Sequence, residues 1–582
     1  MMNRLQSFVS AFCLSLLLPF GAIGQSCGAT PLTTSFETSF VRALYSTGGD
    51  MWYTGLEEAY FVTDPSSRRN FAIMFAGGLW LGAKDPGGNL KVSAQTYGRN
   101  SFDFDYRPGP LNVDGTEFEN CEDWVLPFKI TREEILEYQN RLNLPEPLAP
   151  EMIVDNILGW PGQGNPYFFG IHGHNLPDTP NGLAPFHDED LDGIYDPTRG
   201  DYPLFCGDLA SWSVFHDAVP NQDSNSPASL EMEIHQLVYA TNFSGSPLNT
   251  TTFHEYTFIN RGQEDLIDLH VGQWMDFDLG CPSNDRFNSV PENNLFYYYN
   301  DSAIETQQCF QIGSTTTGTT RPVTIVQILD GLKAYNSDSS EVVNRGMSSI
   351  SGYGNEGFST TPVGAGPARN PTQYYNLLTG KWSGGEPITR GGLGFQTEGD
   401  TTRFAYDGGL DANGVPWRNC NQPDGNITID PRVVMSSGPV IMSPGTSNSL
   451  TIAVTTTFRN NYDGECPDEG PIVRLAGVVK RVFDEFCASS ISTSADPQPA
   501  TVLQLSVYPN PTHGRINFDL PVGSSIQSLQ LFNAAGQRVA TMQGNGPTLS
   551  YDTKANGLPA GLYHYLVRTG DGRSGSGRVV VR

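Results

Sequence analysis

The chain has 582 residues, of which 16% are charged and 11% are aromatic, and it contains 63 Gly and 41 Pro. This composition suits a turn-rich β protein better than a helical one, and the length allows about two to four domains. The net charge of −28 argues against nucleic acid as a partner, because phosphate binding needs clustered Lys and Arg. An acidic surface instead favours cations and solubility outside the cell.

Residues 1–24 have the pattern of a secretory signal peptide. Arg4 gives a basic start, residues 8–20 are largely apolar, and small residues up to Gly24 offer a cleavage site after that glycine. A membrane anchor is the alternative, but the apolar run is shorter than the roughly 20 residues that a span requires. We therefore expect export, and a mature chain without a transmembrane span.

The cysteines favour disulfides over free thiols. An even number remains once the signal peptide and Cys13 are removed, as is usual for an exported protein with paired cysteines. No CxxC motif is present, which disfavours zinc ribbons and thioredoxin chemistry. The pairing stays open from sequence alone among Cys27, Cys121, Cys206, Cys281, Cys309, Cys420, Cys466 and Cys487.

Residues 25–226 are expected to form a loop-rich N-terminal part of the exported cargo. One helix is predicted at residues 131–142, where Thr131 and Glu134 make a capping box ahead of apolar residues with helical spacing. The polar stretch NQDSNSPAS places a soft boundary near Ser226, before a part that is richer in strands.

The stretch APFHDEDLDGIYDPTRGDYP, residues 184–203, carries carboxylates at the spacing of a calcium loop. Calcium binds about six to eight hard oxygens, and alternate acids on a tightly turning chain point inward together. Gly193 permits the turn, while Arg199 stands where an EF-hand has its bidentate Glu. A plain acidic turn is the alternative. The predicted ligands of a structural calcium ion are Asp188, Asp190, Asp192, the carbonyl of Ile194, Asp196 and Asp201.

Residues 227–487 are expected to form the β-sandwich part of the cargo, in one large antiparallel arrangement with few helices. A helix with apolar spacing is predicted at residues 470–487, packed on a sheet. Alternating patterns predict strands at residues 231–243, 251–261, 268–280 and 447–459.

A second acidic group lies in the stretch WMDFDLGCPSNDRFN. Asp276 and Asp278 share one face of the expected strand, and Asp285 returns from a loop. These carboxylates are a candidate second cation site. They equally suit the acid and base of a glycosidase, or solvated residues at a strand end.

No catalytic motif stands out in the sequence. HExxH and GxSxG are absent, and the histidines, including His172 and His174, follow no metal-ligand spacing. All eight tryptophans lie in the cargo, where most are expected in the core and some could form a platform for sugar rings.

Residues 488–503, ASSISTSADPQPATVL, read as a linker, and residues 504–582 read as a small C-terminal β-sandwich. The tail carries seven basic and three acidic residues, in contrast to the acidic cargo, and it has no cysteine. Alternating runs there are joined by turns such as Asp571-Gly572.

This tail resembles the C-terminal sorting domain of the type IX secretion system of Bacteroidota. The resemblance rests on YPNPTHG, LFNAAGQRV and LPAGLYHYLV, with a basic, valine-rich end. It implies secretion machinery as a partner, export across the outer membrane, and release or attachment at the cell surface. The matching motif residues are Tyr508, Pro509, Asn510, Pro511, Gly514, Leu558, Pro559, Ala560, Gly561 and Tyr563.

The cargo is similar to a recurrent, uncharacterised module of secreted and surface proteins of Bacteroidota, through stretches such as FAGGLWLGAKDPGGNLKVSAQTY and ILGWPGQGNP. That likeness implies architecture and no activity. We therefore interpret the chain as an exported, non-enzymatic β protein with a role in adhesion, glycan binding or matrix. The alternative is a secreted polysaccharide hydrolase or lyase that uses carboxylates.

Overall fold

The computed structural model describes the chain from residue 30 onward, with the exception of residues 56–58, 99–102, 119, 143–147, 219–222, 243–246, 280–284, 301–319, 336–341, 355–365, 396–397, 423–429, 461–465, 488–504, 521–524, 534–537 and 570–573. The expected signal peptide, the linker, Cys27, Cys281 and Cys309 lie outside the described residues.

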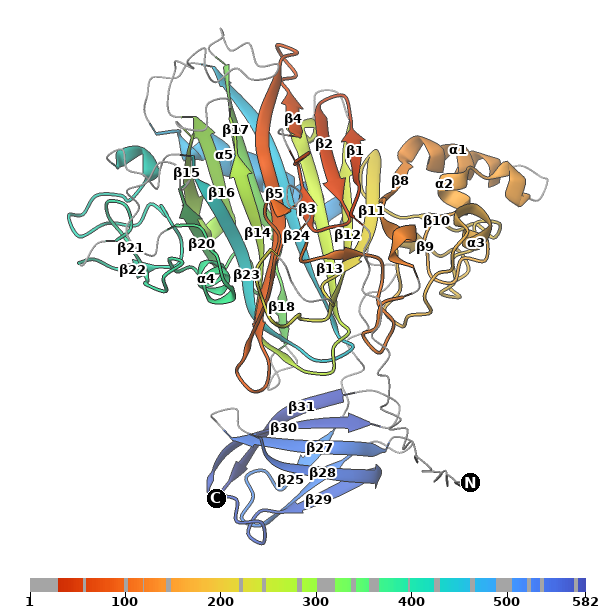
Figure 1. Ribbon diagram of the computed structural model, residues 1–582, viewed down its shortest axis with the longest axis vertical. Helices are drawn as coiled ribbons and strands as arrows, with labels where there is room; N and C mark the ends of the chain where they lie inside the picture. The colour runs from red at the N-terminus through yellow and green to blue at the C-terminus, as the bar shows by residue number, and fades with distance from the viewer. Residues whose placement is uncertain are drawn as a thin grey trace, which may run out of the picture.

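Two antiparallel sheets packed face to face form the larger part of the molecule (Figure 1). In the first sheet the order is β1-β2-β3-β5-β14-β23-β20, with β4 beside β2 and β5, and β6 beside β5. Its strands are β1 (Thr33–Glu37), β2 (Val41–Ser46), β3 (Asp50–Met51), β4 (Tyr60–Thr63), β5 (Asn70–Lys84), β6 (Leu90–Ala94), β14 (Leu266–Phe277), β20 (Ser349–Tyr353) and β23 (Arg432–Met442).

The second sheet has the order β15-β16-β17-β24-β13-β12-β11-β7, with β8 beside β11. Its strands are β7 (Arg107–Pro108), β8 (Phe128–Thr131), β11 (Leu209–His216), β12 (Met232–Ala240), β13 (Thr251–Asn260), β15 (Asp285–Val290), β16 (Leu295–Asn300), β17 (Thr320–Asp330) and β24 (Ser447–Asn460). Short pairs are β9 (Phe186–His187) with β10 (Tyr202–Pro203), β18 (Lys333–Tyr335) with β19 (Val342–Asn344), and β21 (Ile388–Thr389) with β22 (Thr401–Thr402).

The main core lies between the two sheets. Successive side chains of a strand point to opposite faces, so Val271 and Met275 of β14 enter this core while Trp274 leaves it on the other side. The two sheets also share polar contacts, because the hydroxyl of Tyr256 on β13 donates to Gln273 Oε1 on β14 at 3.2 Å. Burial of apolar side chains from both sheets is the principal source of stability.

Helices cover the outer faces of the sandwich. The helix α4 (Pro371–Leu378) packs Tyr374 against Trp80, with ring centroids 4.8 Å apart, and Trp80 stacks on Trp274. The helix α5 (Glu469–Val482) covers part of the second sheet and continues as a π-helical turn, Phe483–Cys487. None of the helices in the described part of the chain is both long and apolar enough to cross a membrane.

The segment from residue 124 to 205 forms a helical flap on the outer face of the second sheet, at one side of the sandwich (Figure 1). It contains α1 (Arg132–Leu142), α2 (Asp155–Leu158), α3 (Phe168–His172), β9 and β10. The predicted capping box begins α1, because Glu134 Oε2 accepts a hydrogen bond from the amide of Thr131 at 2.8 Å. Within the described ranges, short 3-10 helices are η2 (Cys121–Trp124), η3 (Pro150–Met152), η4 (Pro247–Thr250), η6 (Pro291–Asn293) and η9 (Asn419–Asn421).

A second, smaller β-sandwich lies at the C-terminus. It packs β25 (Ser506–Tyr508), β26 (Arg515–Asp519) and β29 (Thr548–Asp552) against β27 (Ile526–Asn533), β28 (Arg538–Gly546), β30 (Gly561–Thr569) and β31 (Ser574–Val581). Its core is built from residues of this region, such as Phe518, Leu529 and Val567. The predicted fold class, a large antiparallel sandwich with few helices followed by a small one, is confirmed.

The predicted strands of the cargo are confirmed as β12, β13, β14 and β24, and the helix predicted at residues 470–487 as α5 with its π-helical turn. Strands from both sides of Ser226 belong to the same two sheets. In the second sheet, for example, β11 pairs with β12 along its whole length, from Leu209 opposite Ala240 to His216 opposite Glu233.

Disulfides close the cargo at two described places, as the cysteine count predicts. Cys206, just before β11, is joined to Cys487 at the end of the π-helical turn, across a sequence separation of 281 residues. Cys420 is joined to Cys466. Cys121 is also disulfide-bonded.

A buried ion pair joins the second sheet to the flap. Glu233 on β12 is fully buried, and Arg261 Nη2 and His235 Nε2 contact its Oε1 at 2.8 and 2.9 Å. Arg261 also donates to Thr179 and Asn181 of the flap, both at 2.7 Å. Although burial opposes ionisation, His235 and Arg261 hold the pKa of Glu233 down to about 2.

We expect Glu233→Gln to reduce the free energy of unfolding by about 3–5 kcal/mol, because it leaves the buried guanidinium of Arg261 without a counter-charge. Urea unfolding at neutral pH measures the effect. The matched control is Glu137→Gln, which breaks an exposed pair with Arg141 and should cost less than about 1 kcal/mol. Equal losses in the two variants would contradict this assignment.

Candidate functional site

The acidic loop predicted from the sequence lies in the flap, between β9 and β10. These strands pair Phe186 with Pro203 and His187 with Tyr202, so they close the loop at its base. Inside the loop, Tyr195 is fully buried, and its hydroxyl donates to the carbonyl of Ile157 at 2.6 Å. The loop is therefore anchored to the helical core of the flap.

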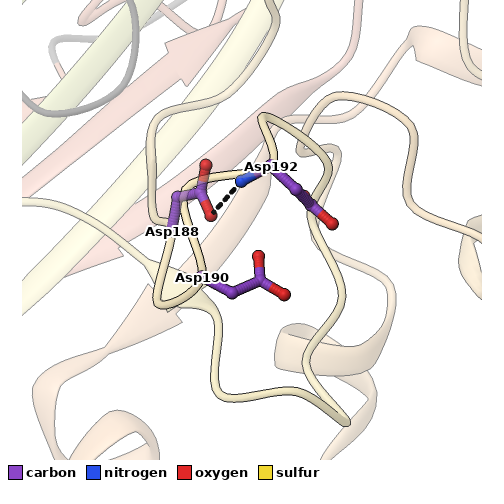
Figure 2. A group of neighbouring side chains, drawn as sticks. All are labelled: Asp188, Asp190 and Asp192. Carbon is purple, nitrogen blue, oxygen red and sulfur yellow. Dashed lines mark hydrogen bonds between the residues drawn. The ribbon is translucent and has the colours of Figure 1, made fainter.

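Three of the predicted ligands come together in this loop. Oxygens of Asp188, Asp190 and Asp192 lie within 4.8 Å of one another (Figure 2). Asp188 accepts hydrogen bonds from the amides of Asp192, at 3.3 Å, and Gly193, at 2.8 Å. Gly193 has φ +77°, the left-handed conformation expected for the turn. The backbone thus folds the alternate acids toward one point.

The other predicted ligands form the frame of the loop. Asp201 is 1% exposed and accepts from the amides of Glu189 at 2.9 Å and Asp196 at 2.8 Å. Burial raises the pKa of Asp201. Asp196 accepts from the amide and hydroxyl of Thr198, at 2.9 and 2.7 Å. Ile194 donates its amide to Asp192 at 2.8 Å, and its side chain is exposed.

Arg199 pairs with two of the three acids. Its Nη1 lies 2.8 Å from Asp192 Oδ2, and its Nη2 pairs with Asp190. A guanidinium therefore lies against the same carboxylates that a calcium ion would use. A cation that binds there must compete with this internal ion pair.

A second group of acids lies on the outer face of the first sheet, where β14 ends beside the start of β23. Asp276, Asp278 and Asp430 bring oxygens within 4.8 Å of one another. Asp276 lies opposite Arg432 in the strand pairing, and Arg432 contacts Asp276 at 3.2 Å and Asp430 at 2.8 Å. Tyr97 donates its hydroxyl to Asp276.

Asp285, the third residue predicted for this group, is fully buried nearby on β15. Its Oδ2 accepts from the amide of Leu279 at 3.0 Å, and its charge acts on Asp278. Sequence reasoning missed Asp430, because only the pairing of β14 with β23, more than a hundred residues apart in the chain, brings it to Asp276. The only local feature that could have pointed to Asp430 is the neighbouring Arg432, a basic residue at the start of a strand.

Negative charge exceeds positive charge in this second group. Burial raises the pKa of Asp276 to about 6, and Arg432 limits the rise. Burial, together with Asp276 and Asp285, raises the pKa of Asp278 well above its ordinary value. A buried set of acids of this kind is stabilised by a shared proton or by a cation.

The histidines and tryptophans of the sequence lie elsewhere. His172 Nε2 lies 2.8 Å from the carbonyl of Gly159, and the rings of His172 and His174 pack among Trp124, Phe128 and Phe168. The acid groups found among the described residues include no histidine. All eight tryptophans are at most 2% exposed, so none offers a face to a sugar ring.

The motif residues of the tail bring its two ends together. The side chain of Asn510 accepts from the amide of Val580 on β31 at 2.9 Å. The carbonyl of Gly514 accepts from the amide of Thr553 at 2.9 Å. Tyr563 is buried and donates its hydroxyl to the carbonyl of Pro559 at 2.8 Å.

Residues 506–582 match the sequence model of the secretion system C-terminal sorting domain. The resemblance of the tail is thereby confirmed: this domain directs the chain to the secretion machinery and to the cell surface or the extracellular space.

A comparison with curated proteins gives no match. Among solved structures, a polysaccharide lyase is 10% identical with a TM-score of 0.16, over 60% of this chain and 34% of the lyase. A biofilm-associated protein (BSP domain) is 10% identical with a TM-score of 0.14, over 97% of this chain and 84% of that one. The chain thus spans about a third of the length of the lyase, and neither likeness bears on function.

Without metal, we expect Asp276 to contribute stability that is present below about pH 4 and is lost as the pH rises from about 4 to about 6. Over this range the folded state holds the proton of Asp276 more tightly than the unfolded state does, so protonation favours folding. Asp278→Asn removes a carboxyl group whose ionisation is opposed by burial and by the neighbouring acids, and it should raise the free energy of unfolding at pH 7.5 by about 1 kcal/mol.

Urea unfolding in chelator, at several pH values, measures this effect. The control is Glu122→Gln, an exposed acid outside the group, which should leave the pH dependence unchanged. A loss of stability in Asp278→Asn at pH 7.5 would contradict the expected repulsion.

Proposed function

We propose that the chain is an exported β-sandwich protein with a non-enzymatic role at the cell surface or outside the cell, in adhesion, glycan binding or matrix. The sorting domain provides the export route. The observation that carries the non-enzymatic part is the convergence of Asp276, Asp278 and Asp430 on one point.

The spacing of these carboxylates disfavours the alternative of a polysaccharide hydrolase. The two carboxyl groups of a glycosidase flank the scissile bond and stand about 5–5.5 Å or 6.5–9.5 Å apart. Here the acids meet within 4.8 Å, and Arg432 ion-pairs with two of them. A sugar ring has no room between groups that are this close and paired with an internal cation.

We further propose that calcium binds the loop through Asp188, Asp190 and Asp192, with the carbonyl of Ile194, Asp196 and Asp201 completing or supporting the site. Three carboxylates that converge on a turn supported by glycine suit a hard, flexible cation, and water can complete its coordination. The role of this ion is structural, because the loop links β9 and β10 to the buried core of the flap. The second acid group, Asp276, Asp278 and Asp430 with Asp285 beside it, is proposed as a weaker cation site.

Calcium is expected to raise the thermal unfolding midpoint of the protein over its value in chelator. At a hundredfold excess over the dissociation constant the stabilisation is about 2.7 kcal/mol. The double variant Asp190→Ala and Asp192→Ala should lose this rise.

Arg199→Gln is the matched variant for the calcium test. It removes the competing guanidinium, so it should lower the midpoint in chelator and enlarge the rise with calcium. If calcium leaves the wild-type midpoint unchanged, the loop binds no structural calcium.

The non-enzymatic role is tested with the secreted protein and a panel of soluble polysaccharides. We expect retention of the protein on one or more of them in affinity electrophoresis, without release of reducing ends or unsaturated products. Release of such products, and its loss in Asp276→Asn, would instead establish the hydrolase or lyase.

A further inference from the structure

A lysine and an asparagine lie opposite each other in the hairpin of β18 and β19. Lys333 pairs with Asn344 in the antiparallel register, so the two side chains leave the same face of the hairpin. Residues that are directly opposed in this way have Cβ atoms about 4.5–5.5 Å apart. A lysine side chain is long enough to cover that separation, and its amine can therefore reach the side-chain carbonyl carbon of Asn344, Cγ.

Asp330, at the end of β17, contacts both of these side chains with one carboxylate. Its Oδ2 pairs with Nζ of Lys333, and its Oδ1 accepts a hydrogen bond from Nδ2 of Asn344 at 2.6 Å. Because both oxygens are bonded to the same carbon, Asp330 holds the amine and the amide nitrogen side by side. A carboxylate in this position can take a proton from one nitrogen and give it to the other.

The side-chain carbonyl oxygen of Asn344 lies between two backbone donors. This Oδ1 accepts hydrogen bonds from the amides of Gly331, at 3.0 Å, and Gly346, at 2.9 Å. Paired amides at such distances form an oxyanion hole, which stabilises the negative charge that develops when a carbonyl is attacked. A Cβ at Gly331 would lie 2.4 Å from the nitrogen of Gly346, so the close approach of the two donors requires glycine there.

The backbone around Lys333 is fixed to the second sheet. The amide of Lys333 donates to Oδ1 of Asn448 on β24 at 2.9 Å, and its carbonyl accepts from Nδ2 of the same residue at 2.8 Å. The amide of Arg345 donates to the carbonyl of Leu332 at 2.8 Å. The reacting groups are thus held next to each other, which makes an otherwise bimolecular reaction effectively unimolecular and much faster.

The hairpin itself buries little apolar surface. The side chains of Tyr335, Val342 and Val343 are all exposed. A two-stranded hairpin is marginally stable in water unless its apolar face is packed against something else. A covalent bond between β18 and β19 would supply stability that burial does not provide.

We propose that Lys333 and Asn344 become joined by an isopeptide bond, in a reaction that Asp330 catalyses. Asp330 takes a proton from the ammonium group of Lys333, and the free amine attacks Cγ of Asn344. The amides of Gly331 and Gly346 stabilise the oxyanion on Oδ1 of the tetrahedral intermediate.

Asp330 then carries protons from the attacking nitrogen to the leaving one. The bond between Nζ and Cγ forms, and the bond between Cγ and Nδ2 breaks. The lysine ammonium and the asparagine carboxamide become a secondary amide and one ammonium ion, so the reaction is balanced without an oxidant or a reductant. This modification goes beyond the binding role proposed above and does not depend on it.

Peptide mapping of the secreted protein by mass spectrometry tests the proposal. An acylated Lys333 is no longer a site for trypsin, so the digest should contain a peptide that runs through Lys333 and ends at Arg345. This peptide should be lighter by one ammonia, about 17 Da, than its sequence predicts. Fragmentation should locate the lost mass in a ring between Lys333 and Asn344.

Two variants separate the roles of the reacting groups. Lys333→Arg keeps a site for trypsin but has no nucleophilic amine, and Asp330→Ala keeps the amine but has no carboxylate to move its proton. Both should give peptides of full mass that are cleaved at position 333. Lys84→Arg is the matched control, because it changes a lysine in another ion pair, 2.9 Å from Asp268, and should leave the cross-link in place.

The wild-type digest decides the outcome even if a variant fails to fold. Cleavage after Lys333 with no loss of mass would overturn the proposal. A succinimide at Asn344 would also lose ammonia, but it would leave the cleavage after Lys333 intact, and that result would overturn the proposal too. A cross-link that persists in Asp330→Ala would overturn the catalytic role of Asp330.

Discussion

The burial of both faces of the central strands is the constraint on which the rest of the cargo depends. Most side chains of β5 and β14 are buried on both faces of the strands, and packing the two sheets together buries only one of these faces. The outward-facing Trp80 and Trp274 require a second layer, which α4 provides. The flap and α5 do the same for the second sheet. The segments α4, α5 and the flap therefore bury the apolar side chains on the outer faces of the two sheets.

Both acid groups lie at the margins of the sandwich, one in the loop between β9 and β10 and the other where the end of β14 meets the start of β23. Each group is paired with an arginine from its own neighbourhood, Arg199 or Arg432. Each arginine offsets part of the repulsion between the converging carboxylates in a protein that is strongly acidic overall. A metal cation that binds either group must compete with that arginine for the same oxygens.

Local patterns in the sequence were sufficient for much of this structure. Alternation located β12, β13, β14 and β24, the capping box located the start of α1, and the tail motifs identified the sorting domain. The spacing of Asp188, Asp190 and Asp192 predicted their convergence, because a single turn brings them together. Asp430 was missed because it reaches Asp276 through the pairing of strands far apart in the chain, and no local pattern encodes that pairing.

The bond between Cys206 and Cys487 has a mechanical consequence. Cys487 is the last described residue before the linker, so a pull on a chain tethered through its C-terminal end reaches the cargo at this point. The covalent link passes the load directly to Cys206, just before β11, which lies in the second sheet between β12 and the short strands β7 and β8. The force therefore bypasses α5, which would otherwise peel from the sheet one turn at a time. A cargo held at the cell surface against flow would bear tension through its second sheet rather than through α5.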